Sequence, residues 1–587
     1  MTPPPGCAVE RATLKLSGKN VYMLILEQFN PGRVPAERLL RRGSRSCYAI
    51  MHFGLNTFSG KEWGYGDEDP AIFTPAAFDA EQIVRACRDG GLSGIILVCK
   101  HHDGFCLWPT KTTPYNITRS PFRGGRGDLV REAADACRKY GLEMGFYVSP
   151  WDRNHPDYGT PAYLKVYQAQ LREIYSGYGP AFEAWFDGAN GGDGFYGGAR
   201  ETRRIDASTY YDWGSTWKIV RDLQPDAVIF SDIGPDVRWP GNENGLAGKE
   251  AFGSYTPHAP VAGREPAPGF ACCAEGENGH ADGRFFIPPE CDVPLRPGWF
   301  YHPEEDELLR SVPALAKIYL RSVGCGGFLN LGIAPDRRGV LHENDVRRLR
   351  EFREMVEALN GEDVVSTALS LSAGEEAVVE FGAKRAFNLI DMAEDLSAGE
   401  SVTGYTIEVR IGGVWREIVS GKAVGLRRMK LLPEIAGDAL RFRLTSAVTG
   451  AARLTLACRP GPAELLNPGA EGAGLPDREN YLELPPGEKR GMALEWLFAQ
   501  PISSHGFLYT PVPGRWAGTP DKYRFELLID GQWRTVAEGE FANLRANPIP
   551  QRVLFAKCAA SGCRLAATRC LEPGDEPVCG AFGLLID

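Results

Sequence analysis

The 587-residue sequence contains no apolar run close to the roughly 18 residues that a transmembrane helix requires. Basic residues are not in excess either: 65 Lys and Arg face 75 Asp and Glu, and the net charge of −10 argues against nucleic acid or a membrane as the main partner. The first residues, MTPPPGCAVERATLKL, lack the charged and apolar regions of a signal peptide. We therefore expect a cytoplasmic protein, or a periplasmic or secreted one if the N-terminus is incomplete.

Signatures of cofactor and metal binding are also missing. No G-x-G-x-x-G follows the first predicted strand and no Walker loop occurs, so a nucleotide-binding open sheet has little support. The 15 cysteines follow neither a zinc-ligand nor a disulfide-framework spacing, which favours mostly reduced, buried thiols. A zinc site on His52, His101 and Asp103 is an alternative, but no further spaced ligands support it. We expect no cofactor and no metal.

From Cys47 onward the sequence alternates between strand and helix patterns. The predicted strands are Cys47–Gly54, Gly94–Lys100, Glu143–Ser149, Ala181–Asp187, Ala227–Asp232 and Phe328–Leu331, and the predicted helices are Asp79–Gly91, Asp128–Gly141, Ala162–Gly179, Tyr210–Leu223, Glu307–Val323 and Val346–Leu359. Such alternation is typical of a parallel sheet. Its extent over residues 35–360 favours a (β/α)8-like TIM barrel with insertions. The stretch Gly234–Pro297 is rich in loops, and its pattern assigns no element.

The pattern changes after Asn360. Short alternating stretches divided by Gly and Pro predict one β-sandwich over residues 361–460 and a second over residues 461–587. Residues 1–34 carry prolines and show no clear period, so we expect an irregular lead-in. The sequence therefore predicts a multidomain protein, in which a (β/α)8-like TIM barrel is followed by two all-β sandwich domains.

Polar side chains gather at the predicted carboxyl ends of the barrel strands, where barrel enzymes place their active sites. Asp187 ends a buried strand, and a carboxylate there is costly to desolvate unless its charge is paired or used. An Asp at the end of a strand more often caps a turn, but the other polar and aromatic residues expected beside Asp187 argue against that interpretation. Aromatic rings, imidazoles and carboxylates together suit a sugar, and two carboxylates could supply a nucleophile and an acid/base. The candidates are His52, Glu62, Trp63, His101, His102, Tyr147, Trp185, Asp187, Arg238, Glu243, Glu290 and Trp299.

Several strings at these strand ends are more specific than their single residues. They are His52-Phe-Gly-Leu-Asn-Thr-Phe, Glu62-Trp63-Gly, Lys100-His-His-Asp-Gly-Phe-Cys, Gly145-Phe-Tyr-Val-Ser-Pro-Trp and Trp185-Phe-Asp-Gly. With them the region from about Val34 to Asn360 resembles the retaining α-L-fucosidases of glycoside hydrolase family 29. The resemblance implies that Asp187 is the nucleophile of a covalent fucosyl-enzyme. It also implies that fucose is held by His52, Glu62, Trp63, His101, His102, Tyr147 and Trp185, to which we add Arg238 and Trp299 as candidates.

The acid/base is assigned by a further string. Arg238-Trp-Pro-Gly-Asn-Glu243 resembles the branch of this family that prefers α-1,3/1,4-linked fucose, which implies Glu243. Glu290 is the second choice, and Glu275 and Glu277 follow. The acid must keep its proton while Asp187 is charged, so we expect it about 5–5.5 Å from Asp187, with a pKa raised by burial and by that charge.

The expected function is that of an exo-acting retaining α-L-fucosidase, which hydrolyses terminal α-L-fucose from fucosylated oligosaccharides or glycoconjugates by double displacement. The stretch from Leu494 to Asp587 resembles a discoidin-type (F5/8 C) β-sandwich, which implies a possible carbohydrate-binding module. Two alternatives stay open: a non-catalytic fucose-binding lectin on the same barrel, and a retaining glycosidase for another sugar such as α-galactose. The fucose methyl should distinguish the sugars, because Tyr147 and Trp185 would line an apolar corner for it.

Overall fold

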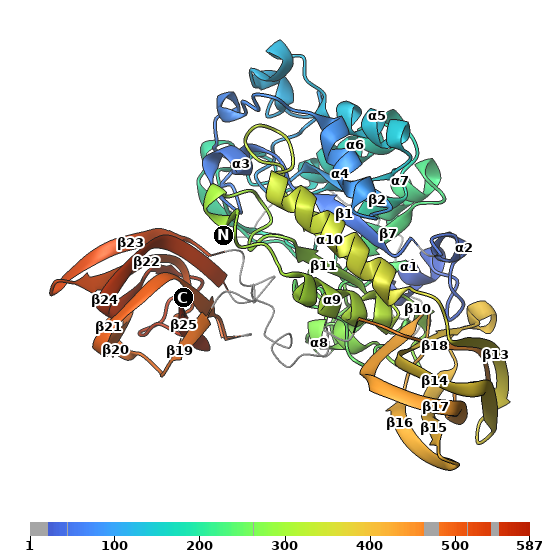
Figure 1. Cartoon of the computed structure of the whole chain (residues 1–587). Helices are drawn as coiled ribbons and strands as arrows, with labels where there is room; N and C mark the ends of the chain where they lie inside the picture. Colours follow the sequence, from blue (N-terminus) through green and yellow to red (C-terminus); the bar gives the residue numbers. More distant parts are fainter. Residues whose placement is uncertain are drawn as a thin grey trace.

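The computed structural model describes residues 21–43, 45–261, 263–462, 480–512, 515–541 and 551–586. Within these residues the N-terminal part has an eight-stranded parallel sheet in the order β11-β12-β1-β2-β3-β4-β7-β8. The strands are β1 (Cys47–Met51), β2 (Gly94–Lys100), β3 (Glu143–Val148), β4 (Glu183–Trp185), β7 (Val228–Ser231), β8 (Val237–Arg238), β11 (Glu290–Pro294) and β12 (Phe328–Ile333). Its two ends meet at a parallel bridge between Arg238 and Pro289, so the sheet forms a nearly closed barrel (Figure 1).

Helices cover the outside of this barrel. After the short α2 (Glu37–Leu40) and α3 (Leu55–Ser59) come α4 (Ala80–Asp89), α5 (Leu129–Tyr140), α6 (Pro161–Gly177), α7 (Trp213–Leu223), α9 (Val312–Arg321) and α10 (Glu343–Leu359). Asp128 accepts the N–H of Arg131 and caps α5, as the sequence predicts. The connection between β7 and β8, residues 232–236, is fully described and holds no helix. The barrel is therefore (β/α)8-like rather than regular.

Each strand predicted within the barrel is present, with ends that differ by a few residues. The two barrel strands that the pattern does not predict, β8 and β11, lie in Gly234–Pro297. β8 is two residues long, and β11 follows Pro288 and Pro289, so neither has the length or composition of a recognisable strand. Between them the chain forms a long excursion with β9 (Ser254–Tyr255), α8 (Cys273–Asn278) and β10 (Phe285–Phe286).

Side chains alternate between the inside and the outside of the barrel, as the two-residue period of a strand requires. In β1, Tyr48 and Ile50 belong to the interior cluster, whereas Ala49 and Met51 pack outward with the helices. Trp185 of β4 is likewise an interior residue. A residue placed two positions after the last interior side chain of a strand is therefore directed into the opening at the carboxyl ends.

The predicted irregular lead-in is wrong for part of its length. Residues 1–20 lie outside the described part, but Val21–Phe29 forms helix α1. Leu26 is buried, and the ring of Phe29 packs edge-on against Trp217 of α7 at 5.8 Å. Tertiary packing thus stabilises a helix too short to show a convincing period in the sequence. Among the described residues, no helix combines the length and the apolarity that crossing a membrane would need.

The first all-β unit (residues 365–459) is one antiparallel sheet with its own apolar core. Its strands are β13 (Val365–Ser372), β14 (Glu376–Glu394), β15 (Val402–Ile411), β16 (Val414–Gly421), β17 (Arg428–Ala447) and β18 (Ala451–Arg459), in the order β13-β18-β14-β17-β15-β16. Arg428 attaches this unit to the barrel domain, because its buried guanidinium donates to the carbonyls of Lys249 and Ala251 at 2.9 and 2.7 Å.

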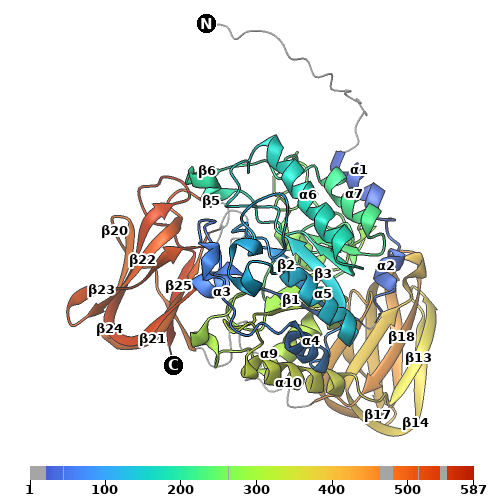
Figure 2. The same cartoon turned by 90° about the horizontal axis from the view of Figure 1, so that it is seen from above.

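The C-terminal all-β unit (residues 480–586) is a second antiparallel sheet with a separate aromatic core. Its strands are β19 (Asn480–Leu484), β20 (Glu488–Arg490), β21 (Ala493–Thr510), β22 (Pro520–Ile529), β23 (Gln532–Glu540), β24 (Gln551–Cys570) and β25 (Ala581–Ile586). In the views of Figures 1 and 2 the two all-β units lie on opposite sides of the barrel domain. The C-terminal unit approaches the barrel near a short hairpin, β5 (Gly192–Gly194) and β6 (Glu201–Arg203).

A layer of buried charge lies inside the barrel, below the carboxyl-end opening. Glu183 and Glu290 are fully buried, and Arg42 Nη2 lies 2.5 Å from Glu183 Oε2. The Arg42 guanidinium also packs 4.5 Å from the ring centre of Tyr48. Burial and the charge of Glu290 raise the pKa of Glu183 well above its ordinary range, and Arg42 opposes this. One cation therefore balances two neighbouring carboxyl groups, one of which keeps its proton.

Replacing Arg42 by Met should destabilise the barrel by about 3–5 kcal/mol, because a buried carboxyl pair would lose its only cation among the described neighbours. Urea denaturation followed by tryptophan fluorescence measures the loss. Arg45→Met is the matched control: Arg45 is half exposed and pairs with Glu143 at the surface, so its removal should cost about 1 kcal/mol or less. Equal denaturation midpoints for the two variants would contradict the structural role of Arg42.

Candidate active site

A cavity opens at the carboxyl ends of the barrel strands, where the sequence predicts the active site. Its lining residues are Ile50, His52, Trp63, His101, His102, Tyr147, Trp185, Asp187, Gly188, Ala189, Phe230, Asp232, Trp239, Glu243, Asp292 and Trp299. Most of the predicted site residues are among them, although they come from segments far apart in the sequence. The period of the strands explains this, since His52 and Asp187 each follow an interior residue, Ile50 or Trp185, by two positions.

Asp187 presents a carboxylate that is held from two sides. Its Oδ2 accepts a hydrogen bond from the Tyr147 hydroxyl at 2.8 Å, and its Oδ1 accepts the N–H of Ala189 at 2.6 Å. Burial raises the pKa of Asp187, and these two hydrogen bonds oppose that shift. The side chain is still 23% exposed, so the carboxylate faces the cavity. A fixed, partly desolvated carboxylate of this kind is suited to act as a nucleophile.

His52, His101 and His102 form a cluster of neutral imidazoles beside Asp187. The rings of His101 and His102 lie 4.2 Å apart, and those of His52 and His101 lie 5.7 Å apart. Burial lowers the pKa of His52 to about 3 and lowers the pKa values of His101 and His102 well below their ordinary range. The chain turns at His101–His102 directly after β2, which allows both neighbours to reach one cavity. Neutral imidazoles can both donate and accept hydrogen bonds to hydroxyl groups.

The hydrogen bonds of His102 fix its tautomer. Ser149 Oγ donates to the carbonyl of Trp151 at 2.8 Å, so the same oxygen accepts from His102 Nδ1–H, also at 2.8 Å. His102 Nε2 then carries a lone pair and lies 3.7 Å from Asp187 Oδ2. At this distance a hydroxyl oxygen cannot lie on the line between the two acceptors, but it can contact both from one side and donate its proton to one of them.

Aromatic rings form the apolar part of the cavity. Trp185 stacks on Phe230 with ring centres 4.3 Å apart and lies 4.9 Å from Tyr147. Trp63 packs edge-on against His102 at 4.6 Å, and Trp299 lies 5.0 Å from His52. The cavity therefore combines flat apolar faces with polar groups, as expected for a site that binds a sugar.

Glu243 and Asp292 supply a second group of carboxyls in the cavity. Glu243 Oε2 accepts the indole N–H of Trp299 at 3.2 Å, and Asp292 Oδ1 accepts that of Trp239 at 2.9 Å. Burial and, next, the charge of Glu243 raise the pKa of Asp292 well above its ordinary range. The two groups therefore titrate together, and the pair retains a proton at pH values where an isolated carboxyl would lose it.

Asp232 is a further cavity carboxyl. It follows the interior residue Phe230 by two positions, as Asp187 follows Trp185. Burial raises the pKa of Asp232 to about 7, and the charge of Asp187 contributes to this increase. The carboxylate also accepts the N–H of Gly269 at 2.7 Å, and this hydrogen bond lowers the pKa. A Cβ on Gly188 would lie 2.4 Å from Asp232 Oδ2, which explains why glycine follows the nucleophile candidate.

A family model described as "Alpha-L-fucosidase" matches residues 36–362, more than half of the chain. The chain belongs to the α-L-fucosidases of glycoside hydrolase family 29. The fucosidase is 34% identical over 453 residues to α-L-fucosidase 1 of Arabidopsis thaliana, a match that covers 71% of this chain and 85% of the plant protein.

Solved structures agree with this membership. The crystal structure of a glycoside hydrolase 29 family member from an unknown rumen bacterium has 35% identity and a TM-score of 0.70, and covers 95% of this chain and 100% of that chain. A glycoside hydrolase family 29 fucosidase of Ruminococcus gnavus, solved in complex with fucose, has 25% identity and a TM-score of 0.62, and covers 74% of this chain and 96% of that chain. The fucosidase is thus a glycoside hydrolase, which sets the lectin alternative aside.

Three predicted site residues of the fucosidase are not among the described residues that line the cavity: Arg238, Glu290 and Glu62. Arg238 is fully buried, and its guanidinium donates to the carbonyls of Gly276 and Phe252 at 2.8 and 2.9 Å. Because side chains alternate, the inward position at the end of β8 belongs to its neighbour Trp239. The prediction of Arg238 as a substrate-binding residue is therefore wrong: it fixes the excursion between β8 and β11.

Glu290, the second choice for the acid/base, lies one layer below the cavity. It accepts hydrogen bonds from the hydroxyl of Tyr48 at 2.6 Å and from Trp185 Nε1 and Asn330 Nδ2, both at 3.0 Å. With no exposed surface it cannot reach a substrate, so its assignment is corrected. Asp292, two residues further along β11, occupies the inward position that does line the cavity.

Glu62 lies at the edge of the site and holds Trp299 in place. Its carboxylate accepts the backbone N–H groups of Trp299 and Phe300 at 2.8 and 3.2 Å and lies 2.8 Å from His302 Nε2. Burial alone would raise the pKa of Glu62, but His302 and the two N–H groups lower it. Conversely, although burial opposes the shift, Glu62 raises the pKa of His302 to about 9.

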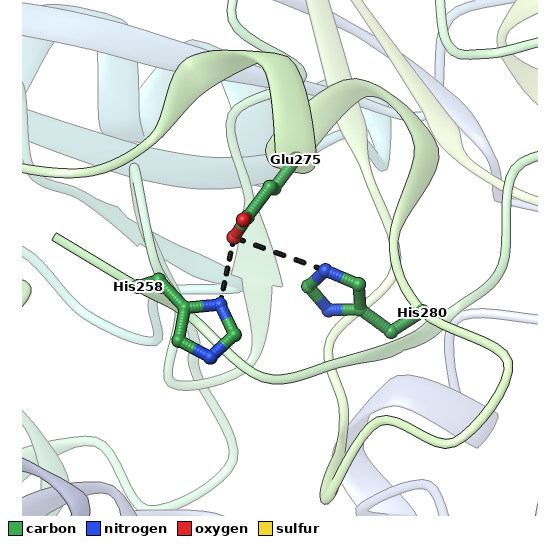
Figure 3. A group of neighbouring side chains, drawn as sticks. All are labelled: His258, Glu275 and His280. Atoms are coloured by element: carbon green, nitrogen blue, oxygen red, sulfur yellow. Dashed lines mark hydrogen bonds and ion pairs between the residues drawn. The ribbon is translucent and has the colours of Figure 1, made fainter. Parts of the chain in front are cut away.

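Outside the cavity, His258, Glu275 and His280 bring three possible metal ligands within 4.8 Å of one another (Figure 3). Among the described residues they are the only such group, and His52, His101 and Asp103 do not form one. His280 Nδ1 accepts the N–H of Thr256 at 3.2 Å, which places its proton on Nε2, toward Glu275. A metal-binding histidine instead uses its second nitrogen as a donor. The group therefore suits a hydrogen-bonded cluster that ties α8 to neighbouring parts of the same excursion, and Glu275 is occupied there.

The lining residues outside the set of predicted candidates are Ile50, Gly188, Ala189, Phe230, Asp232, Trp239 and Asp292. Asp232 ends a predicted strand, and counting two residues on from an inward Phe230 would have identified it. Trp239 and Asp292 cannot be placed by counting in this way, because the sequence pattern around them does not predict a strand.

Proposed function

We propose that the fucosidase releases terminal α-L-fucose by double displacement, with Asp187 as nucleophile and Glu243 as acid/base. The observation that carries this proposal is the composition of the cavity. Asp187, Asp232, Glu243 and Asp292 line it, while no Lys or Arg is among its described lining residues. Several carboxyls without a cation cannot all be ionised, so charged and protonated groups coexist, as acid and nucleophile must.

In the first displacement an Asp187 oxygen attacks the anomeric carbon, and the bond to the leaving oxygen breaks as that oxygen takes the proton of Glu243. The Tyr147 hydroxyl and the Ala189 N–H keep the attacking carboxylate in place. In the second displacement Glu243 takes a proton from water, and the resulting hydroxyl attacks the same carbon and releases Asp187. Loss of the Asp187 charge in the covalent intermediate lowers the pKa of the acid and favours its change to base.

Fucose recognition follows from the neutral imidazoles and the aromatic faces. A sugar hydroxyl that lies to one side of His102 Nε2 and Asp187 Oδ2, which are 3.7 Å apart, can contact both and donate to one of them. The rings of Trp185, Phe230 and Tyr147 offer an apolar corner for the fucose methyl, whereas the hydroxymethyl group of galactose would lose hydration there.

Asp187→Asn should abolish hydrolysis of 4-nitrophenyl α-L-fucoside while fucose binding, measured by calorimetry, survives.

Glu243→Gln should slow release from an oligosaccharide roughly 10²–10⁴-fold and slow the aryl fucoside less, because nitrophenolate leaves without a proton. Glu290→Gln is the matched control and should leave the ratio of the two rates unchanged. First formation of the β-anomer, seen by proton NMR, would refute double displacement.

Asp292→Asn tests whether Glu243 and Asp292 share the acid's proton. In the wild type the negative charge shared by the two carboxyls makes their last proton harder to lose. The neutral asparagine removes this effect, so the alkaline limb of the kcat/KM profile should shift to a pH lower by about one unit or more. The acidic limb, which follows ionisation of Asp187, should stay in place. An alkaline limb at the wild-type pH would show that Glu243 keeps its proton without Asp292.

The preferred linkage is proposed to be α-1,3/1,4. Support comes from the string Arg238-Trp-Pro-Gly-Asn-Glu243, in which Asn242 stiffens the loop: its Nδ2 donates to the Leu246 carbonyl at 2.8 Å, and its Oδ1 accepts the Asn244 N–H at 3.1 Å. Incubation with Lewis-type trisaccharides beside 2′-fucosyllactose, followed by quantification of free fucose, should show preferential release from the trisaccharides. The reverse preference would count against the branch and against Glu243. The carbohydrate-binding role of residues 461–587 stays a prediction.

A further inference from the structure

We propose that the C-terminal all-β unit braces the active site, and that Arg569 is a positioning residue for the aromatic wall formed by Trp151, Trp63 and His102. The inference concerns the α-L-fucosidase reaction as such, so it does not depend on which cavity carboxyl is the acid. It goes beyond the carbohydrate-binding role that the sequence suggests for this unit.

The brace begins at the interface between the C-terminal unit and the barrel. Arg569, near the end of β24, forms an ion pair with Asp193 of the β5–β6 hairpin. It also donates through Nε and Nη2 to Asp521 of its own unit, at 2.9 and 2.5 Å. A second contact lies close by, where Lys522 Nζ stands 5.6 Å from the ring centre of Tyr65. The unit therefore touches two barrel segments that continue toward the cavity.

The hairpin between the unit and the barrel depends on such support. β5 and β6 are three residues long each, too short to be stable alone. From the barrel side, Arg153 Nε donates to the Asp193 carbonyl at 2.7 Å and Arg153 Nη1 to the Gly64 carbonyl at 2.8 Å. Asp193 is thus held by one guanidinium from the barrel and one from the C-terminal unit. Figure 2 shows β5 and β6 on the side of the barrel that faces this unit.

The hairpin in turn packs against the wall of the cavity. Gly192 lies so close to Trp151 that a Cβ there would be 3.1 Å from the indole ring. Trp151 Nε1 donates to the Tyr196 hydroxyl at 3.0 Å, which donates to the Gly192 carbonyl at 2.8 Å. Residues 192–196 therefore fix the plane of Trp151 by both contact and hydrogen bonding.

Trp151 transmits this position to two lining residues. Its ring centre lies 5.6 Å from that of Trp63, in an edge-to-face arrangement, and 5.4 Å from that of His102. Its backbone carbonyl also accepts the Ser149 hydroxyl that orients His102. A shift of the hairpin would therefore move the face against which the sugar lies and the imidazole that accepts its hydroxyl. Because the affected residues bind rather than react, the main effect should be on substrate binding.

The test compares Arg569→Ala with Arg564→Ala in the full-length enzyme, using 4-nitrophenyl α-L-fucoside. Arg564 lies on the same strand, and its ion-pair partners Glu526 and Glu495 both belong to the C-terminal unit. Arg569→Ala should raise KM roughly five- to tenfold with a smaller change in kcat, since coupled neighbours share energies of this order. Arg564→Ala should keep the wild-type KM. A purely structural role of Arg569 would lower the active fraction, and thus the apparent kcat, without moving KM.

Asp193→Asn tests the same brace from the barrel side and covers the case in which Arg569→Ala does not fold. It should raise KM as Arg569→Ala does, and the double variant should be no worse than either single one. The quenching of tryptophan fluorescence by bound fucose should change in both single variants. Wild-type KM in both, or effects that simply multiply in the double variant, would overturn the proposal.

Discussion

Inside a closed barrel the two-residue period of a strand decides which side chains can meet. Interior residues fill the barrel, and the next inward position on each strand emerges at its carboxyl end. Ile50 is followed in this way by His52, Trp185 by Asp187, Phe230 by Asp232 and Glu290 by Asp292. The candidate active site is thus the top layer of the barrel core, and the packing beneath it sets the positions of its side chains.

Two neighbouring layers of this core treat buried charge differently. In the lower layer Arg42 balances Glu183 and Glu290, which gives a satisfied cluster that is sealed from solvent. In the upper layer the described lining residues include carboxyls and neutral imidazoles but no basic side chain. Protons must take the place of cations there, and protons can move during a reaction. The sealed carboxyls are therefore accompanied by a guanidinium, whereas the cavity carboxyls are accompanied by protons without a basic side chain among the described lining residues.

The sequence was sufficient where local patterns determine structure. Long strands such as Gly94–Lys100, capped helices such as the one after Asp128, and strings of adjacent polar residues such as His101–His102 all lie where they were expected. It was insufficient where tertiary pairing alone creates an element. β8 is a strand only because it pairs with β7, so the orientation of Arg238 could not be judged in advance.

Long-range contacts show the same limit. Nothing near Arg569 in the sequence indicates that it meets Asp193, because an ion pair between two units has no local periodicity. The apolar residues of α1 were too few to show a helical period, and their packing against α7 decides their structure. The parts of the site that depend on a single strand were therefore predictable, whereas those that depend on docking of separate segments were not.

The excursion between β8 and β11 leaves and re-enters the barrel at adjacent points, because Arg238 and Pro289 form a bridge. Because its two ends lie side by side, this segment can be lengthened, shortened or reshaped while the strands on either side keep their register. Gly269, Trp239 and Glu243 all belong to this segment: Gly269 donates its N–H to Asp232, Trp239 donates to Asp292, and Trp239 and Glu243 line the cavity. Sequence changes confined to this excursion therefore alter the lining of the cavity and leave the folding of the barrel strands unchanged.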